Sequence, residues 1–230
     1  MPNYTRSDLV TQVSELIGDT SNQQWSTTQI QDRLQKAQEK FVSDTRALRD
    51  TQSFSIVAGT NTYDLSTDTF DIARVGLTSK GVLKRIGKFD MDLLVGGSWQ
   101  SVNGTPSSYY VDVSSTNKKL TLYPIPQSAD AGTNNLVVDY VKVPPVMASD
   151  SDAPLNGQTL LQPYLDALAY FAAAQILYAS NNPTDWTKAN VMIKQYDTKA
   201  TECITLFNDL SETTPLRLKI SGIGRVVNAR

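Results

Sequence analysis

The sequence predicts an α+β fold in which helices from both ends of the chain form one bundle and a β-rich segment is inserted between them. Apolar residues recur every three or four positions near both ends, which indicates amphipathic helices, whereas the middle alternates polar and apolar residues, which indicates strands. A third observation is a run so apolar that it must be buried among helices. We therefore expect a helical bundle from residues 1–52 and 146–212, an antiparallel sandwich-like or barrel-like domain from residues 53–145, and an extended arm from residues 213–230.

The most apolar run covers residues 160–182 and carries a single charge, Asp166. Its apolar residues occupy most of the circumference of a helix, so the helix must be surrounded by protein. The run is too short and too rich in Ala and Tyr to span a membrane well. Five small residues would let neighbouring backbones approach, and we expect this alanine-rich surface near a contact between subunits: Ala167, Ala169, Ala172, Ala173 and Ala174.

Composition excludes several classes of function. The chain of 230 residues is 40% hydrophobic and 19% charged, as in a soluble protein with one large domain or two modest ones. Its net charge of -2 gives no bulk attraction to nucleic acid or acidic membranes. Histidine is absent and Cys203 is the only cysteine, which excludes internal disulfides, Cys/His zinc sites and imidazole catalysis. No signal region is visible at the start, so we expect a reducing cytoplasm as the place of synthesis.

Two amphipathic helices are predicted before the β-rich segment. The first covers residues 5–17 and stops at Gly18, which accepts a left-handed conformation. The second begins after Ser26, because Ser26 and Gln29 fit a capping box, and it continues to about residue 48. Its charged side is interpreted as a solvated face, with a binding patch as the alternative: Asp32, Arg33, Lys36, Glu39 and Lys40.

The middle of the chain predicts strands, one hairpin and one short helix. Phe70 and Ile72 are expected to point inward from their strand, and the hairpin tip is expected at residues 114–118. Phe89 and Leu93 are placed to cover a sheet edge from a helix over residues 88–95. The expected strands are residues 53–57, 63–65, 70–77, 82–86, 108–113, 119–123 and 134–143.

The last helix is predicted over residues 184–211 and repeats its apolar positions at heptad spacing. A lone coiled coil is one interpretation. An antiparallel hairpin with residues 160–182 is favoured, because only a short connection separates the two helices. The heptad positions are Trp186, Ala189, Ile193, Tyr196, Ala200, Cys203, Phe207 and Leu210.

No catalytic, cofactor or metal site emerges from the motifs. Acidic residues cluster in predicted turns, at Asp64, Asp68, Asp71, Asp150 and Asp152, but their spacing forms no calcium loop and Asp favours turns for local hydrogen bonds. Cys203 is expected to be a buried thiol rather than a nucleophile. The tyrosines of the strands fill a sheet face or, alternatively, line a stacking platform: Tyr109, Tyr110, Tyr123 and Tyr140. The chain is not expected to be an enzyme.

The C-terminal arm alternates apolar and basic residues and contains no acid after Glu212. Disordered tails are normally polar, so this pattern is unusual at a terminus. Three interpretations stay open: an edge strand on its own subunit, disorder, or a strand added to a partner's sheet edge. The candidate binding residues are Leu216, Arg217, Leu218, Lys219, Ile220, Arg225 and Arg230.

Three motifs of the β-rich segment occur in an order that resembles a known family. Residues 54–65 look like an "F-x-hydrophobic-x-x-G-x-x-x-Y-x-L" opening, carried by Phe54, Gly59, Tyr63 and Leu65. Residues 104–109 are similar to a "G-x-P-x-x-Y" element, and residues 120–126 to an "I-x-L-x-P-x-P" strand end. Together with the amphipathic helix that follows, they resemble the head-to-tail adaptor (connector) proteins of tailed bacteriophages, especially short-tailed ones.

The resemblance implies a structural virion protein of the tail or neck that is assembled in the host cytoplasm. It implies a dodecameric homo-oligomeric ring, an arm that binds the portal protein, and a platform for the tail nozzle or fibres. Double-stranded DNA would pass through the ring without specific recognition, with no membrane involved. Either the second helix, through Arg33, Lys36 and Lys40, or loops of the β domain would line that channel.

Two alternatives use the same residues differently. A capsid decoration or fibre-attachment protein would share the β domain without forming a ring. A carbohydrate-binding tail module would use the tyrosines and the acidic turns. Ring mass and deletion of the arm separate these alternatives.

Overall fold

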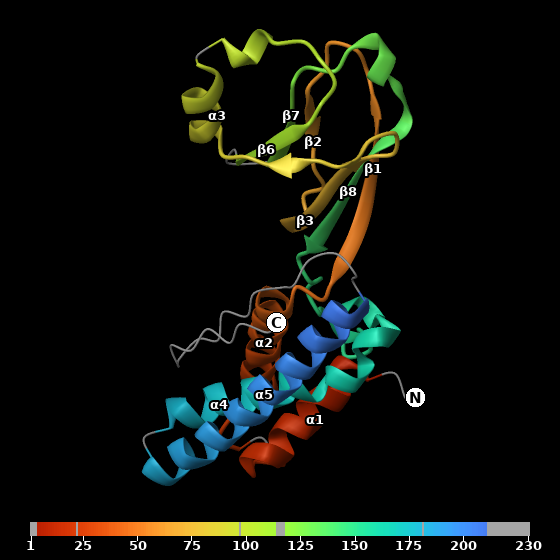
Figure 1. The fold of residues 1–230 in the computed structure, drawn as a ribbon. Coiled ribbons are helices and arrows are strands. Elements are labelled where there is room, and N and C mark those ends of the chain that lie inside the picture. The colour runs from red at the N-terminus through yellow and green to blue at the C-terminus, as the bar shows by residue number, and fades with distance from the viewer. Residues whose placement is uncertain (1–3, 22, 97, 114–117, 181, 211–230) are drawn as a thin grey trace. The chain divides into compact units, whose positions relative to one another are not determined.

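The computed structural model describes residues 4–21, 23–96, 98–113, 118–180 and 182–210. The chain divides into two compact units, one containing Met1–Leu48 and Pro144–Arg230 and the other Arg49–Val143. The first unit is helical and the second is built mainly from strands (Figure 1). The protein is therefore α+β, as the sequence predicts.

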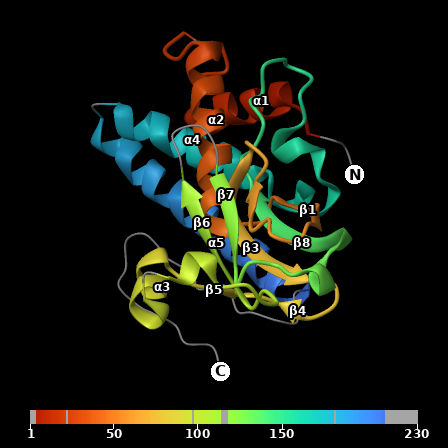
Figure 2. The same ribbon diagram turned by 90° about the horizontal axis from the view of Figure 1, so that it is seen from above.

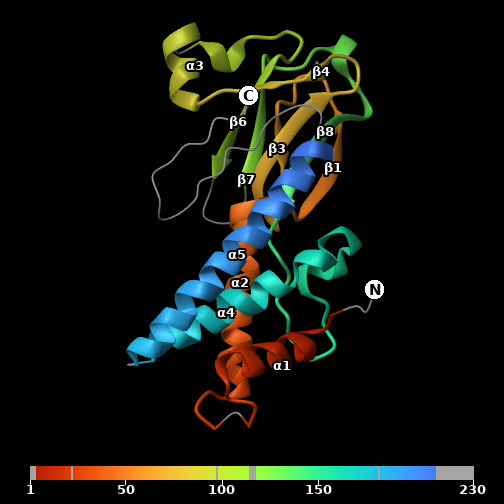
Figure 3. The same cartoon turned by 60° about the horizontal axis from the view of Figure 1, so that its bottom comes forward.

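Within its described residues, the helical unit contains four α-helices: α1 (Arg6–Ile17), α2 (Thr27–Thr45), α4 (Asp166–Ala179) and α5 (Pro183–Leu210). Two 3-10 segments, η3 (Pro154–Gly157) and η4 (Thr159–Tyr164), precede α4. Pro163 lies in η4, so the α-helical part of the apolar run starts later than the sequence predicts. Each of α1, α2 and α5 packs on α4, and α4 lies beside α5 as the predicted hairpin (Figure 3).

Local sequence signals fix the ends of the first two helices. Thr5 and Asp8 form a capping box at the start of α1, and Gly18 ends it with a left-handed φ of 76°. Ser26 and Gln29 form the predicted capping box at the start of α2. The helix ends earlier than predicted, because Arg46 takes the left-handed conformation that closes it.

The connection between α1 and α2 is held by Asp19, whose carboxylate accepts hydrogen bonds at 2.9 Å from three backbone N–H groups: those of Gln23, Gln24 and Trp25. The bond from Trp25 contributes most to lowering the pKa of Asp19, and those from Gln23 and Gln24 lower it further, against the opposing effect of desolvation. These donors favour the ionised carboxylate.

Replacement of Asp19 by Asn tests this arrangement. A lowered pKa means that the stabilisation is present above the unfolded pKa and is lost as the pH falls through the folded pKa. We therefore expect Asp19→Asn to lower the urea midpoint at pH 7, and the difference from the parent to shrink as the pH falls below the ordinary range of an aspartate. A difference that stays constant from pH 7 to pH 3 would contradict the role of the charge.

The centre of the helical unit is α4, whose alanines are fully buried within this one chain. Ala167, Ala169, Ala172, Ala173 and Ala174 are 0% exposed. The prediction that this surface lies at a subunit contact is therefore wrong for these alanines. Small side chains here let α1, α2 and α5 of the same chain approach α4 closely.

The predicted heptad face of α5 is buried in its middle only. Ala189, Tyr196, Ala200 and Cys203 are buried, whereas Trp186 is 46% exposed. Trp186 lies at the start of α5, beside the connection from α4, where its indole N–H donates to the carbonyl of Ser180 at 2.9 Å. Among the helices of the described residues, none is both long and apolar enough to cross a membrane.

The described part of the second unit forms two four-stranded sheets (Figure 2). One has the order β1-β8-β3-β4 and the other β2-β7-β6-β5. Pairing is antiparallel except between β5 and β6. The bounds are β1 (Arg49–Ile56), β2 (Thr62–Asp64), β3 (Thr69–Leu77), β4 (Gly81–Val82), β5 (Lys84–Arg85), β6 (Ser108–Val113), β7 (Lys118–Tyr123) and β8 (Gly132–Lys142).

Both sheets contribute to one core, so the unit is sandwich-like. Val75 and Val138 from the first sheet join Tyr109 and Leu122 from the second in a single hydrophobic cluster. The described strands form no closed barrel, and the barrel-like alternative is wrong. The hairpin arms match the prediction, and its tip at residues 114–117 lies outside the described residues.

Three residues of this unit that were predicted to be covered are exposed. Phe70 is 43% exposed, because the pairing of β3 with β8 is irregular between Thr69 and Asp71 and the alternation slips there. Phe89 and Leu93 of α3 (Lys88–Val95), which were predicted to cover a sheet edge, are 72% and 69% exposed, while Met91 of that helix is buried. Strand β1, which follows α2, also starts earlier than predicted, at Arg49 instead of residue 53.

Candidate interaction surfaces

The arm residues predicted to bind a partner lie outside the described residues. They are Leu216, Arg217, Leu218, Lys219, Ile220, Arg225 and Arg230. Their role stays a prediction. The structure does describe the other candidates from the sequence: the basic side of α2, the acidic turns, the single thiol and the strand tyrosines.

The three basic residues of α2 do not form one patch. Arg33 and Lys36 line a small depression together with Trp25 and Ile176. Lys40 instead pairs with Asp44, with 2.6 Å between Nζ and Oδ1. A continuous cationic strip along α2 is therefore interrupted by an acid within the same helix.

Asp44 also binds α5, because its Oδ2 accepts a hydrogen bond of 2.6 Å from the hydroxyl of Tyr196. The Tyr196 ring packs against Phe41 and Phe171, with centroid distances of 6.5 and 5.0 Å. Burial raises the pKa of Tyr196, and the hydrogen bond to Asp44 raises it further. The phenol stays protonated and holds α2 to α5, which is a structural role.

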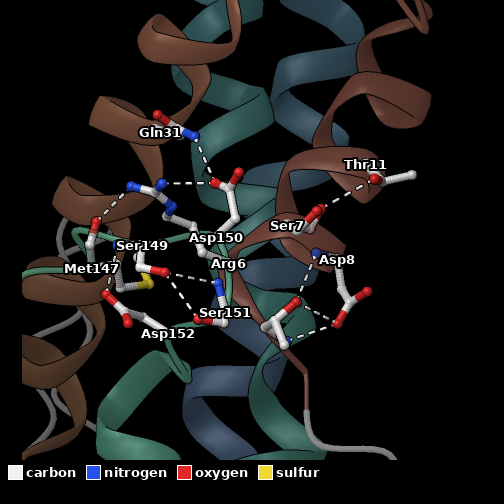
Figure 4. A network of polar contacts seen from close by, with 11 residues as sticks. Arg6, Ser7, Asp8, Thr11, Gln31, Met147, Ser149, Asp150, Ser151 and Asp152 are labelled. Atoms are coloured by element: carbon white, nitrogen blue, oxygen red, sulfur yellow. Dashed lines mark hydrogen bonds and ion pairs between the residues drawn. The ribbon is translucent and has the colours of Figure 1, made fainter.

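The loop before α4 is held to α1 by a polar network around Arg6 (Figure 4). Its guanidinium donates to the carbonyl of Met147 and pairs with the carboxylate of Asp150, both at 2.7 Å. The side chain of Gln31 on α2 donates to the same carboxylate oxygen at 3.2 Å. The Asp152 carboxylate accepts from the backbone N–H of Ser149 at 2.8 Å. Asp150 and Asp152 are therefore tied into loop structure, as the turn interpretation predicts.

The acidic residues of the β unit are also paired, but two of them lie in strands rather than in the predicted turns: Asp64 ends β2 and Asp71 lies in β3. Asp64 pairs with Lys119 at 3.7 Å, Asp68 with Lys142 at 3.2 Å, and Asp71 with Arg85 at 3.3 Å. In the described part of the chain, no cluster of three acidic, cysteine or histidine side chains has the geometry of a metal site.

The single thiol, Cys203, lies buried on α5. Burial raises its pKa to about 12, so it stays protonated at neutral pH. A thiol in that state is a poor nucleophile, which agrees with the predicted structural role.

The strand tyrosines fill the interior rather than lining a platform. Tyr109, Tyr110 and Tyr140 are buried. Tyr110 and Tyr123 meet the buried Trp99 edge-on, with centroid distances of 5.4 and 6.2 Å. Burial of these rings argues against a carbohydrate-binding module, which would need exposed tyrosines to stack on a sugar.

A family model described as "SU10 adaptor protein" matches residues 4–217, a range that includes all the described residues. The chain belongs to the SU10 adaptor protein family. The match is consistent with the head-to-tail adaptor resemblance and supports a phage adaptor structural protein. A structural adaptor family implies a protein that is not an enzyme. Comparison with curated proteins found no significant match.

For a member of the SU10 adaptor protein family, exposed apolar surfaces are candidate contacts with other virion components. One lies on α3 of the β unit, where Phe89 and Leu93 are one helical turn apart and both exposed. Another lies near the start of α5, where Trp186 and Val191 are exposed and Pro183 and Lys188 border a shallow depression.

Sequence reasoning missed the α3 surface because it expected Phe89 and Leu93 to cover a sheet edge. Met91 is buried, and it lies two residues from both Phe89 and Leu93, which places it on the opposite side of the helix. Because the chain belongs to an adaptor family, this exposed pair is a candidate contact with another virion component.

Proposed function

We propose that this protein is the head-to-tail adaptor of a tailed bacteriophage. Copies of the chain form a ring, which we take to be a dodecamer, at the neck of the virion. The C-terminal arm binds the portal protein, the β unit provides the docking platform for the tail nozzle or fibres, and DNA passes through the ring. The observation that carries this proposal is the family match over residues 4–217.

Two features of the chain support the details. The arm combines four basic residues with alternating apolar residues and lacks acids, which suits a strand that adds to a partner's sheet edge. The exposed pair Phe89 and Leu93 gives the β unit an apolar surface for a nozzle or fibre protein. The family match ends at residue 217, so the portal role of residues 218–230 depends on their sequence pattern alone.

Deletion of residues 216–230 tests the portal contact. We expect the truncated protein to lose co-purification with the portal protein while its helical circular dichroism stays unchanged, because the described helices end at Leu210. A matched variant with Phe89→Ser and Leu93→Ser is expected to keep portal binding. Unchanged portal affinity of the truncated protein would contradict the arm assignment.

Ring formation is tested separately by native mass spectrometry, with and without the portal. A dodecamer has about twelve times the 25.3 kDa mass of one chain. A protein that stays monomeric with the portal present and binds fibre protein instead would favour the capsid decoration or fibre-attachment alternative.

A further inference from the structure

Helix α3 of the β unit has an anchored side and an open side. On the anchored side, Met91 is 1% exposed and lies in one hydrophobic cluster with Trp99. The indole N–H of Trp99 donates to the carboxylate of Asp92 at 2.6 Å, and Nζ of Lys88 lies 3.6 Å from a carboxylate oxygen of Asp112. Residues 88, 91 and 92 are three and four positions apart, so they share one side of the helix. These contacts hold α3 in one orientation within its own unit.

The open side of α3 carries two apolar side chains and one acid. Phe89 and Leu93 are 72% and 69% exposed and lie one helical turn apart. Asp90 is exposed beside Phe89, and within the described part of the chain no hydrogen bond or ion pair engages its carboxylate. Because the other side already fixes the helix, a partner that covers these residues orders little that was free before.

The open side of α3 specifies the kind of surface that fits it. Amphipathic helices bind other proteins by placing apolar residues at positions i and i+4 into an apolar groove. Phe89 and Leu93 have this spacing, so the matching groove has an apolar floor. The carboxylate of Asp90 lies beside that pair and favours Lys or Arg at the rim of the groove.

The charge of α3 also argues against a nucleic acid as its ligand. Asp90 and Asp92 are both exposed, and the phosphates of a nucleic acid would be repelled by two carboxylates. The surface that suits α3 therefore belongs to a protein.

We propose that α3 docks as a helix into an apolar groove with a basic rim on the tail protein that binds the β unit. Phe89 and Leu93 fill the groove, and Asp90 pairs with a cation at its rim. This inference rests on the proposed function, in which the β unit receives a tail protein. It adds the element that makes the contact and the chemistry of the surface that receives it.

Binding of the purified tail nozzle and tail fibre proteins of the same phage to the full chain tests this docking. For the tail protein that binds the parent, we expect Phe89→Ser with Leu93→Ser to raise Kd at least about thirtyfold, because truncation of central apolar anchors has the largest effect on binding. The matched control is Val82→Ser with Val113→Ser, two residues of the same unit that are 63% and 73% exposed. This control is expected to change Kd by less than about twofold.

A second set of variants tests the basic rim. Asp90→Lys is expected to raise Kd about tenfold at low ionic strength and by less in roughly 1 M salt, where charges are screened. Asp90 also lies in the first turn of α3, where a negative charge stabilises the helix. Asp90→Glu keeps that charge and is expected to bind like the parent. Asp64→Lys makes the same charge change outside α3, at a side chain that is 67% exposed, and is expected to leave Kd unchanged.

Three results would overturn the docking of α3 while leaving the proposed function intact. The first is a tail protein that binds the parent and the Phe89→Ser, Leu93→Ser variant equally. The second is a change in the oligomer mass of that variant without any tail protein, because α3 would then contact a second copy of the chain. The third is tighter binding by Asp90→Lys, which would exclude a basic rim. If neither tail protein binds the parent, the docking of α3 and the platform role of the β unit both fail.

Discussion

Replacement of Phe41 by Ala is expected to destabilise the helical unit by about 3–5 kcal/mol, the usual cost of emptying the site of a buried phenylalanine. Phe41 is 0% exposed on α2, where its ring meets that of Tyr196 on α5. The cavity would lie between helices that are already held close by alanines, so the surroundings have little freedom to collapse into it. Urea denaturation followed by circular dichroism at 222 nm measures the loss, since the helical unit contains most of the helix.

The matched control for this substitution is Phe89→Ala in α3. That ring is 72% exposed, and exposed sites change stability by within about 0.5 kcal/mol. A Phe41→Ala protein whose urea midpoint differs from the parent no more than that of Phe89→Ala would refute the packing of α2 against α5 described above.

Replacement of Gln38 by Leu is expected to cost roughly 2–4 kcal/mol, although the two side chains have similar size. The Gln38 amide is buried on α2 and makes two bonds of 2.7 Å: it donates to the carbonyl of Pro145 and accepts from the N–H of Leu155. Leu leaves both backbone groups buried without a partner, and each unsatisfied group costs about 1–3 kcal/mol.

The effect of Gln38→Leu is measured by the same urea titration, with Gln195→Leu as its matched control at an exposed position of α5. Hydrogen exchange adds a local measurement, because the amide of Leu155 is expected to lose protection in Gln38→Leu. Unchanged protection of that amide together with an unchanged midpoint would show that the two bonds contribute little.

The elements that could be predicted from the sequence are those fixed by local chemistry. The capping box of Ser26 and Gln29, the left-handed stop at Gly18 and the bounds of α3 depend on a few neighbouring residues, and all agree with the structure. The hairpin arms β6 and β7 follow from alternation alone. Such features require no knowledge of distant parts of the chain.

The errors concern which partner covers an apolar residue. The alanines of α4 were predicted to lie at a subunit contact because the sequence does not reveal how many helices of the same chain surround α4. In the structure, α1, α2 and α5 pack on α4 and its alanines are fully buried. Phe70 faces outward because of an irregular register that no local pattern specifies. Nor does alternation within β1 indicate whether a strand lies at an edge, which depends on the order of the whole sheet.

Some of the candidate interaction residues could be assigned from the sequence, and others required the structure. Asp150 and Asp152 could be assigned to loop structure from composition, and Arg6 supplies the partner that the sequence did not name. The exposed pair on α3 required the structure, because burial of Met91 excludes Phe89 and Leu93 from the core.

The helical unit is assembled from two segments that are separated in the chain by the whole β unit. On the ribosome, α1 and α2 emerge first and have no central helix to pack on until α4 and α5 are made. The delay is on the order of ten seconds or more, since synthesis adds roughly 5–20 residues per second. During that time the apolar sides of α1 and α2, including Phe41, are open to chaperones, while the β unit already has every strand that its own two sheets require. Translation speed across residues 144–210 is therefore expected to influence the yield of folded protein.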